Sequence, residues 1–305
     1  MLHDMLDLKR LRFLREVAER GTITAAAEAL AYTPSAISQQ LSILEEEIGT
    51  PLLERQGRNV ALTPAGRVLV DHAPAVFDAV ERATTAVSEA TGEVAGRVMV
   101  GALASVMAAL IPDTFQSLAV EHPGVVLHLV ELSHEDAARE LRLGALDVAV
   151  DQRYKHVPHT RHQGLNKRKI LDEPLYLAVP ARSSIRKLSD ASEHRWVAAP
   201  LEVSECGRAV RAICRSAGFE PKVHYEIDDF EVTLQLVASV DACAILPALA
   251  LTRVPPEVRL LPLSGPTRQV VAVTRPAAQD RLAVLAFLNH LERAAAKRSL
   301  QLPAA

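Results

Sequence analysis

The sequence predicts a multidomain α+β protein, with a helical N-terminal part followed by a longer part in which strands and helices alternate. Up to Glu93 the chain contains no convincing β-branched run, whereas short apolar runs alternate with helical patterns after it. Two glycines, Gly92 and Gly96, flank the change and mark a domain boundary. Hydrophobic residues make up 49% of the 305 residues and charged residues 23%, a composition that excludes global disorder.

Charge and cysteine content narrow the class of protein further. The net charge of −3 gives no overall basic balance of the kind that attracts nucleic acid. Three cysteines form no disulfide framework and predict reduced thiols in a cytoplasmic protein. The longest apolar run, about Val98–Pro112, is shorter than the roughly 18 residues of a membrane span. The first residues carry charges and have no apolar segment of signal-peptide length. We therefore expect a cytoplasmic location and no membrane partner.

The first two predicted helices are short and are bounded by ordinary helix signals. One covers about Leu8–Glu19 and ends at Gly21, because glycine accepts the left-handed conformation that follows a helix. The next begins at Thr24, which is expected to be its N-cap, and is rich in alanine up to Leu30. Its small side chains would allow another helix to approach closely.

The third predicted helix follows after a short turn, so that the pair forms a helix-turn-helix. Thr33 is its expected N-cap, Pro34 suits its first position, and it ends at Gly49. One face is apolar, and the other carries hydroxyl and amide groups: Ser35, Ser38, Gln39 and Ser42, with Glu46 in the last turn. Such groups can read base edges in the major groove. The same pattern also fits the solvated face of an ordinary bundle helix.

The charges of the N-terminal part count partly against nucleic-acid binding. Residues 1–91 hold nine Lys and Arg residues against thirteen Asp and Glu residues, a net charge of −4. However, Arg55 and Arg58 cluster in an irregular segment that suits a β-hairpin wing, from which an arginine can reach the minor groove or a phosphate.

About 60 consecutive residues resemble the LysR-type transcriptional regulators, in the order of that family. The matching runs are Phe13–Leu30, Thr33–Leu41 followed by Leu44-Glu45, Gly49–Arg55 and Leu62–Gly66. The resemblance implies a winged helix-turn-helix with Pro34–Leu44 as the reading helix and Glu54–Thr63 as the wing. It also implies a long linker helix and a C-terminal sensor domain of two α/β lobes, similar to a periplasmic binding protein.

The expected domain boundaries follow from this resemblance. Residues 1–63 would bind double-stranded DNA and residues 64–93 would form the linker helix. Residues 97–171 with 272–300 would form sensor lobe I, and residues 172–271 sensor lobe II. The candidate DNA contacts are Thr33, Pro34, Ser35, Ser38, Gln39, Ser42, Arg55 and Arg58.

The linker helix is expected to hold a homodimer. Thr63 can cap it, Pro64 can open it, and it should run to about Ala90 with a kink at Pro74. Apolar residues recur at three- and four-residue spacing and leave a narrow seam: Val68, Leu69, Ala73, Val76, Phe77, Val80, Ala83 and Val87. The alternative is packing against the chain's own body. The sensor lobes would pair two dimers into a homotetramer.

The C-terminal part shows the alternation expected of βαβ units and a mostly parallel sheet. Its expected strands lie near Val98–Val100, Val125–Val130, Val148–Val150, Leu175–Val179, Trp196–Ala198, Val223–Ile227, Ala244–Leu246 and Val270–Val273. A segment rich in proline and glycine, Pro255–Pro266, breaks the second half. Val240 and Ala242 depart from the two glycines usual in the family before Leu246-Pro247, which puts the local turn in doubt.

A small-molecule effector is expected at the carboxyl ends of these strands, where open α/β sheets bind their ligands. The candidate residues are Ala104, Ser105, Gln152, Arg153, Glu202, Val203, Ser204 and, from the pair Asp228-Asp229, Asp229. Helix N-termini at Ser105 and Ser204 favour an anionic or polar effector. The alternative for each residue is ordinary loop solvation.

Other chemistries find weaker support. The sequence has no GxGxxG and no P-loop spacing, so we expect neither an enzyme nor a bound cofactor. His156, His159 and His162 suggest a metal only weakly, because Pro158 interrupts them. A cysteine-based redox sensor of the same family is the alternative function. If Cys206 and Cys214 share a helix they are about 12 Å apart along its axis, beyond the roughly 7 Å that a disulfide spans.

Overall fold

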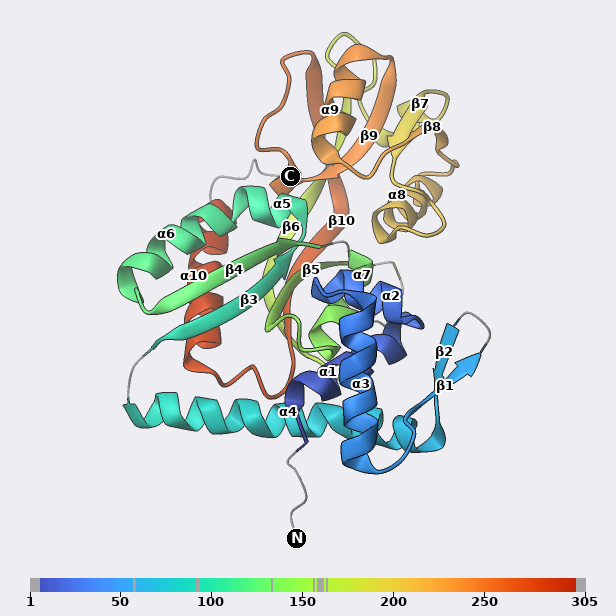
Figure 1. Cartoon of the computed structure of the whole chain (residues 1–305). Helices are drawn as coiled ribbons and strands as arrows, with labels where there is room; N and C mark the ends of the chain where they lie inside the picture. Colours follow the sequence, from blue (N-terminus) through green and yellow to red (C-terminus); the bar gives the residue numbers. More distant parts are fainter. Residues whose placement is uncertain are drawn as a thin grey trace. The chain divides into compact units, whose positions relative to one another are not determined.

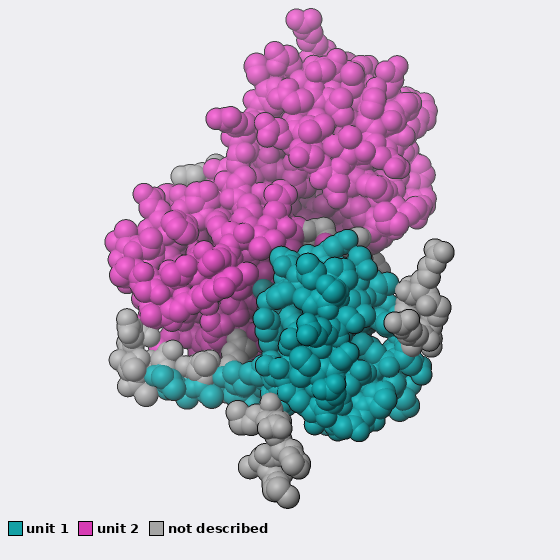
Figure 2. Space-filling view, in the orientation of Figure 1, with its two compact units in different colours: residues 1–90, 142–145 teal, residues 91–141, 146–305 magenta. Residues whose placement is uncertain are grey.

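The computed structural model describes residues 6–56, 59–91, 94–132, 134–155, 157, 162 and 164–299. It divides into two compact units, residues 1–90 with 142–145 and residues 91–141 with 146–305 (Figure 2). Within the described ranges, no helix combines the length and the apolar character needed to cross a membrane.

The first unit begins with three helices, α1 (Leu8–Arg20), α2 (Ile23–Leu30) and α3 (Pro34–Ile48) (Figure 1). Their apolar faces pack into one core that includes Leu14, Ile37 and Leu44. The prediction of Thr24 as the N-cap of α2 is wrong. The hydroxyl of Thr22 accepts the hydrogen bond from the backbone N–H of Ala25, so α2 begins one residue after Thr22 and contains Thr24.

The third helix has the ends that the sequence predicts. The Thr33 hydroxyl accepts a hydrogen bond from the backbone N–H of Ala36, Pro34 occupies the first turn, and Gly49 ends the helix with a φ of 77°. The turn between α2 and α3 contains Ala31 in the left-handed region, with a φ of 57°. Three residues therefore separate the two helices, as a helix-turn-helix requires.

A two-stranded wing and a long helix complete the first unit. Strands β1 (Leu53–Gln56) and β2 (Asn59–Leu62) pair antiparallel, and α4 (Pro64–Thr91) follows directly. The Thr63 hydroxyl caps α4 by accepting a hydrogen bond from the backbone N–H of Gly66. Helix α4 includes Pro74 and is continuous as a single 28-residue element.

The apolar seam of α4 is only partly covered within the first unit. Ala73 is buried, and Leu69 packs against the core of the helix-turn-helix. Val68, Val80 and Val87 remain exposed, with relative exposures of 59%, 42% and 66%. Because Val80 and Val87 lie seven residues apart, they occupy equivalent positions of a heptad and lie on one stripe of α4.

The second unit is built on one eight-stranded mixed sheet, in the order β4-β3-β5-β10-β6-β9-β7-β8. Its elements are β3 (Gly96–Ala102), α5 (Ala104–Ala109), α6 (Ile111–Glu121), β4 (Val125–Glu131), α7 (His134–Arg142), β5 (Val148–Tyr154), β6 (Asn166–Pro180), a 3₁₀ turn (Leu188–Ala191), β7 (Arg195–Ala198), α8 (Glu205–Ser216), β8 (Lys222–Glu226), α9 (Phe230–Ser239), β9 (Ala242–Pro247), a 3₁₀ turn (Ala248–Ala250), β10 (Val258–Thr274) and α10 (Leu282–Ser299).

Two long antiparallel strands, β6 and β10, run through both halves of this unit (Figure 1). We call the half with β3, β4, β5 and α10 the first lobe, and the half with β7, β8, β9, α8 and α9 the second lobe. The first lobe has its core around Val98 and Phe287, and the second around Trp196 and Leu234. The two lobes thus share one continuous sheet and are not separate domains with a sheet each.

The sheet, expected to be mostly parallel, is mixed, because four of its seven described strand pairs are parallel and three are antiparallel. The parallel pairs are β3–β4, β3–β5, β7–β8 and β7–β9, and the antiparallel pairs are β5–β10, β10–β6 and β6–β9. The chain crosses from the first lobe to the second on β6 and returns on β10, which makes these two strands antiparallel. The predicted break at Pro255–Pro266 is instead a register shift between Pro262 and Thr267 within β10.

The exposed stripe on α4 predicts the effect of placing a charge in the seam. Val80→Glu should raise the dimer dissociation constant of the full chain at least about tenfold, because a carboxylate would enter an apolar interface. Sedimentation velocity across a concentration series measures this change. Ala75→Glu adds the same charge at an exposed position of α4 that lies about 140° around the helix from Val80, and it should leave the dimer intact. Equal effects of the seam variant and this control would show that the seam is not the interface.

Candidate functional site

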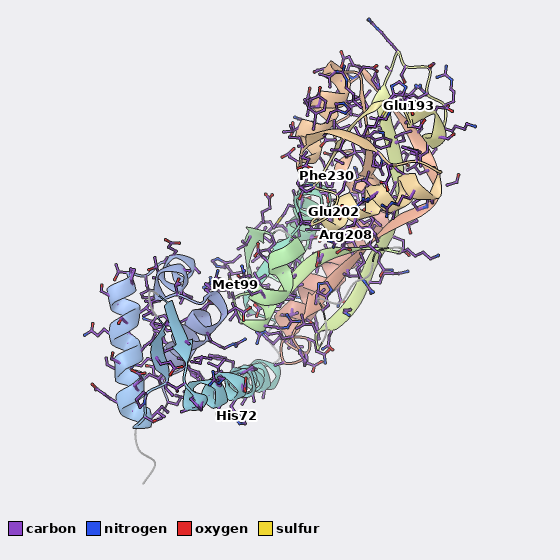
Figure 3. The ribbon with its side chains drawn as sticks, turned by 90° about the vertical axis from the view of Figure 1, so that its right-hand side faces the viewer. His72, Met99, Glu193, Glu202, Arg208 and Phe230 are labelled. Atoms are coloured by element: carbon purple, nitrogen blue, oxygen red, sulfur yellow. The ribbon has the colours of Figure 1, made fainter. Side chains whose placement is uncertain are left out.

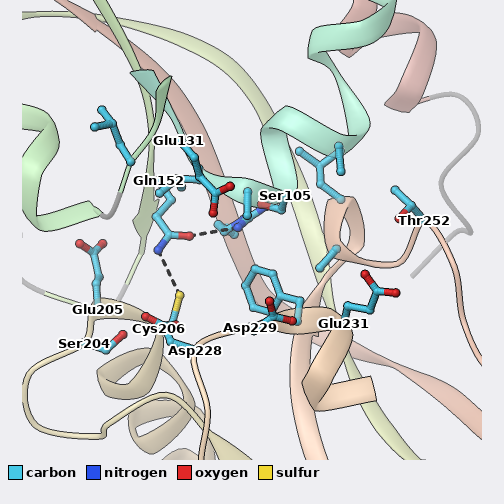
Figure 4. Close-up of a pocket in the computed structure, with 18 of the residues that line it drawn as sticks. Ser105, Glu131, Gln152, Ser204, Glu205, Cys206, Asp228, Asp229, Glu231 and Thr252 are labelled. Carbon is cyan, nitrogen blue, oxygen red and sulfur yellow. Dashed lines mark hydrogen bonds between the residues drawn. The ribbon is translucent and has the colours of Figure 1, made fainter. Parts of the chain in front are cut away.

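A cavity of about 710 Å³ lies between the two lobes of the second unit. Its first-lobe wall comes from the start of α5 and the end of β4, and its second-lobe wall from the residues that begin α8 and α9 (Figure 4). The volume lies in the range of pockets that enclose small organic ligands. The cavity opens where strands of both lobes end, which is the position expected from the sequence.

Six of the eight expected effector residues line this cavity: Ala104, Ser105, Gln152, Val203, Ser204 and Asp229. Arg153 and Glu202 are not among the residues that line it. Successive side chains of a strand point to opposite faces, so the placement of Gln152 in the cavity turns Arg153 away. Glu202 lies at the end of the second lobe that faces the first (Figure 3), where its exposed carboxylate pairs with Arg211.

The sequence departure at Val240 and Ala242 does not reach the cavity. Val240 follows the end of α9 in an extended conformation, and Ala242 begins β9. Neither residue lines the cavity.

Four charged residues of the lining were not among the sequence candidates: Glu131, Glu205, Glu231 and Arg268. Arg268 lies on β10 at the base of the cavity. Its side chain is fully buried and donates hydrogen bonds to Glu173 at 2.6 Å, to the amide oxygen of Gln152 at 3.0 Å and to the Ser105 hydroxyl at 3.0 Å. Glu173, on β6, also accepts the backbone N–H of Leu249 at 2.6 Å.

These contacts leave a fully paired buried guanidinium. Burial alone would lower the pKa of Arg268, but the charge and hydrogen bond of Glu173, together with the nearby Tyr154 and Cys206, outweigh it, and the pKa is raised.

Cys206 lies in the first turn of α8 and reaches the same cluster. Its sulfur accepts a hydrogen bond from the Gln152 side-chain amide at 3.1 Å and lies 3.4 Å from the Tyr154 hydroxyl. Burial raises the pKa of the Cys206 thiol, and hydrogen bonds and the nearby charge of Arg268 offset this only in part. The thiol is therefore mainly protonated at neutral pH.

The start of α8 is held tightly against the end of β7. A Cβ on Gly207 would lie 2.2 Å from the carbonyl oxygen of Pro200 and 2.6 Å from that of Ala199. Only glycine therefore allows this approach. Arg208 donates hydrogen bonds to the backbone oxygens of Glu202 and Val203, which fixes the loop that forms the second-lobe wall.

The predicted DNA-reading face of α3 is exposed in the first unit. The side chains of Thr33, Pro34, Ser35, Ser38, Gln39 and Ser42 are all exposed, whereas Ile37, Leu41 and Leu44 are buried. Only the backbone of Arg55, in β1, is described, and Arg58 lies outside the described residues.

The acidic residues at the end of α3 have structural partners. The Glu45 carboxylate accepts hydrogen bonds from the backbone N–H groups of Leu52 and Leu53, at 2.8 and 3.0 Å, and so positions the start of the wing. Glu47 pairs with Arg10 of α1. Two of the acidic residues in this negatively charged unit, Glu45 and Glu47, therefore have partners within the unit and do not lie on the exposed hydroxyl face of α3.

The three histidines that only weakly suggest a metal are not all within the described residues. His156 and His159 lie outside the described residues, and His162 is buried 2.8 Å from the carboxylate of Asp151. Cys206 and Cys214 do share a helix, α8, and both thiols are free. Burial raises the pKa of Cys214 and of Cys243 to about 12.

Comparison with known protein families matches two adjacent parts of the chain. Residues 8–67 match the bacterial regulatory helix-turn-helix protein of the lysR family, and residues 91–296 match the LysR substrate binding domain. The chain belongs to the LysR family. It is therefore a DNA-binding transcriptional regulator with an effector-binding domain.

Relatives of this LysR protein cover most of its length. The transcriptional dual regulator GltC of Bacillus subtilis is 28% identical over 278 residues, covering 89% of this chain and 91% of GltC. A probable hydrogen peroxide-inducible genes activator of Mycobacterium avium is 31% identical over 212 residues, covering 68% and 67%. A hydrogen peroxide-bound OxyR variant of Corynebacterium glutamicum shares the fold, with a TM-score of 0.60, 21% identity and coverage of 99% and 98%.

The buried pair at the base of the cavity predicts a large stability effect. Glu173→Gln removes the charge that compensates Arg268 and should lower the free energy of unfolding by about 3–5 kcal/mol. Urea denaturation followed by circular dichroism measures this loss. Glu292→Gln removes a carboxylate from a half-exposed pair with Arg168 and should cost less than about 1 kcal/mol. Similar small losses for both variants would contradict the assigned role of the buried pair.

Proposed function

We propose that this LysR regulator reads its operator with the N-terminal half of α3 and responds to an effector bound between the two sensor lobes. The observation that carries the proposal is the exposed row of hydroxyl and amide side chains on α3, held on a buried apolar stripe. Such groups pair with base edges in the major groove. Thr33, Pro34, Ser35, Ser38, Gln39 and Ser42 would contact DNA from α3, and Arg55 and Arg58 from the wing.

The effector would contact both lobes at the residues that line the cavity. We assign this role to Ala104, Ser105, Gln152, Val203, Ser204 and Asp229, and add Arg268 as the residue that positions Ser105 and Gln152. Arg153 and Glu202 are left out of the assignment because they do not line the cavity. A ligand that contacts both lobes can favour one arrangement of the assembly, and so change operator affinity.

The proposed domain division keeps residues 1–63 for DNA binding and residues 64–93 for the dimer helix. Residues 97–171 with 272–300 make sensor lobe I, and residues 172–271 make lobe II. The seam of α4 would hold the homodimer, and the sensor lobes would join two dimers into a tetramer. A regulator that binds chromosomal DNA acts in the cytoplasm, and we propose that location.

A second candidate function is peroxide sensing by Cys206. Two observations favour it: the sulfur lies in the cavity beside Gln152 and Tyr154, and the relatives include a probable peroxide-inducible activator. In that reaction the thiol would attack peroxide, take one oxygen as a sulfenic acid and release water. A disulfide with Cys214 would require α8 to unwind. The raised pKa of Cys206 favours the effector over this alternative.

The reading assignment predicts a loss of specific DNA affinity. An operator is first selected from a random DNA library with the full-length protein. Gln39→Ala and Ser35→Ala should each weaken binding to that operator by about 1–3 kcal/mol, through loss of base contacts. Binding to random DNA should change little. Gel-shift titrations measure both, with Glu46→Ala as an exposed control in the last turn of α3. Equal losses on the two DNAs would mean that these residues do not read bases.

The thiol environment predicts slow alkylation of Cys206 near neutral pH. Because the pKa is raised, the thiolate fraction at pH 7.5 is below that of an ordinary thiol, and it grows as the pH rises. Iodoacetamide should therefore label Cys206 about tenfold more slowly than glutathione at pH 7.5. The rate should still be climbing above pH 9. Peptide mass spectrometry follows the site.

The opposite outcome would favour peroxide sensing. That outcome is labelling of Cys206 at least as fast as glutathione, together with loss of peroxide-dependent operator binding in Cys206→Ser.

A further inference from the structure

The ionisable groups that line the cavity between the lobes are mostly acidic. Five carboxylates line it: Glu131, Glu205, Asp228, Asp229 and Glu231. The cationic side chain that the structure describes in the lining is Arg268, and its charge is already paired with Glu173. The described lining therefore carries more acidic than basic side chains.

These carboxylates come from both walls of the cavity. Glu131 ends β4 in the first lobe, whereas the other four belong to the second lobe, around the starts of α8 and α9 (Figure 4). Helix capping accounts for part of the set: Asp229 accepts the backbone N–H of Val232 at 2.8 Å, and Glu205 and Glu231 lie in first turns, where negative charge is favourable. It does not account for Glu131, which ends a strand.

The expectation of an anionic effector finds no support in this geometry. Helix α5 has only six residues, and the Ser105 hydroxyl already accepts a hydrogen bond from Arg268. At the start of α8, the Ser204 hydroxyl accepts the backbone N–H of Gly207 at 3.5 Å. An anion placed between these two helices would face the five carboxylates without a free cationic partner among the described lining residues.

The spread of the carboxylates favours an organic cation over a metal ion. In the part of the chain that the structure describes, the one group of three possible ligands within 4.8 Å is Glu121, His122 and His290, outside the cavity. Both carboxylate oxygens of Glu121 there accept hydrogen bonds from Arg293. The cavity carboxylates form no such cluster, so their charges suit separate cationic groups on one extended molecule.

The apolar part of the lining completes the match. Leu103, Leu132, Val203, Phe230 and Leu249 line the cavity between the carboxylates. Aliphatic side chains suit a methylene chain, and the ring of Phe230 can face an ammonium group.

We propose that the effector is an aliphatic di- or polyamine whose ammonium groups pair with Glu131 on one wall and with Asp229 and Glu231 on the other. The inference rests on the proposed function, because the effector site itself is proposed from the cavity and from the family match. The carboxylates indicate only the charge of the ligand. Without a ligand the facing carboxylates repel each other across the cavity. A dication between them removes that repulsion and favours the arrangement in which the walls are closer.

The experiment compares ligands of opposite charge on the full-length protein. Spermidine and 1,4-diaminobutane are titrated by calorimetry at fixed ionic strength, beside succinate, which has the same four-carbon length and two negative charges. We expect at least one amine to bind with a dissociation constant of about 1 mM or below, and succinate to give no binding heat.

Charge-removing variants locate the bound amine. Glu131→Gln and Glu231→Gln should each weaken amine binding at least about tenfold. Both residues are exposed, so a matched thermal melt should show that the variants stay folded. Glu257→Gln removes the same charge from an exposed second-lobe residue outside the cavity lining and should leave binding unchanged.

Several outcomes would overturn the proposal. These are succinate binding as tightly as the amines, no binding of either amine at about 10 mM, and amine binding that neither cavity variant weakens. Operator binding is measured in the same preparations by gel shift. The proposed function fails if the wild-type protein does not bind its selected operator, or if it binds amine without any change in operator affinity. In either case, amine binding that the cavity variants weaken would still support a di- or polyamine as the ligand. If operator binding is intact but amines do not bind, the ligand class alone fails.

Discussion

The buried ion pair between Arg268 and Glu173 is the contact on which the sensor domain depends. It joins β10 to β6, the two strands that run through both lobes, at the base of the cavity. Removing either partner would leave a charge with no water to solvate it, so the pair ties the two crossing strands strongly. The same guanidinium fixes Ser105 and Gln152, and Gln152 in turn holds Cys206. The same ion pair therefore links the two strands that connect the lobes and positions the residues at the base of the cavity.

Local signals in the sequence predicted the three helices of the DNA-binding unit and most of their ends. Thr33, Pro34 and Gly49 define α3 through capping and backbone preference, which are properties of neighbouring residues. Ile37, Leu41 and Leu44 separate its buried face from its exposed face by spacing alone. The N-cap of α2 is Thr22, two residues before the predicted Thr24. Both threonines have the same hydroxyl group, so the local sequence does not distinguish which of them caps the helix.

The sensor domain was predicted less completely, because its decisive contacts join residues far apart in the chain. Strand patterns revealed where strands lie but not their direction, so the antiparallel crossing of β6 and β10 was missed. Arg268 lies 163 residues from Ser105 and 116 from Gln152, and no local pattern distinguishes it from a surface arginine. Arg153 is different: the two-residue alternation of β5 already separates it from Gln152, and applying that rule would have removed it from the candidates.

The position of the cavity determines how ligand binding can change the structure outside the binding site. The sheet is continuous from one lobe to the other, so a change in the distance between the walls must be absorbed where β6 and β10 cross. Arg268 and Glu173 hold these strands on one side of that point. The register shift between Pro262 and Thr267 interrupts their hydrogen bonding on the other. A rigid ion pair next to a weakened ladder is the arrangement expected of a hinge, because bending concentrates where backbone hydrogen bonds are missing. In the proposal made above, repulsion between carboxylates on the facing walls would act on the distance between the lobes, so that an electrostatic difference would favour one lobe separation over another.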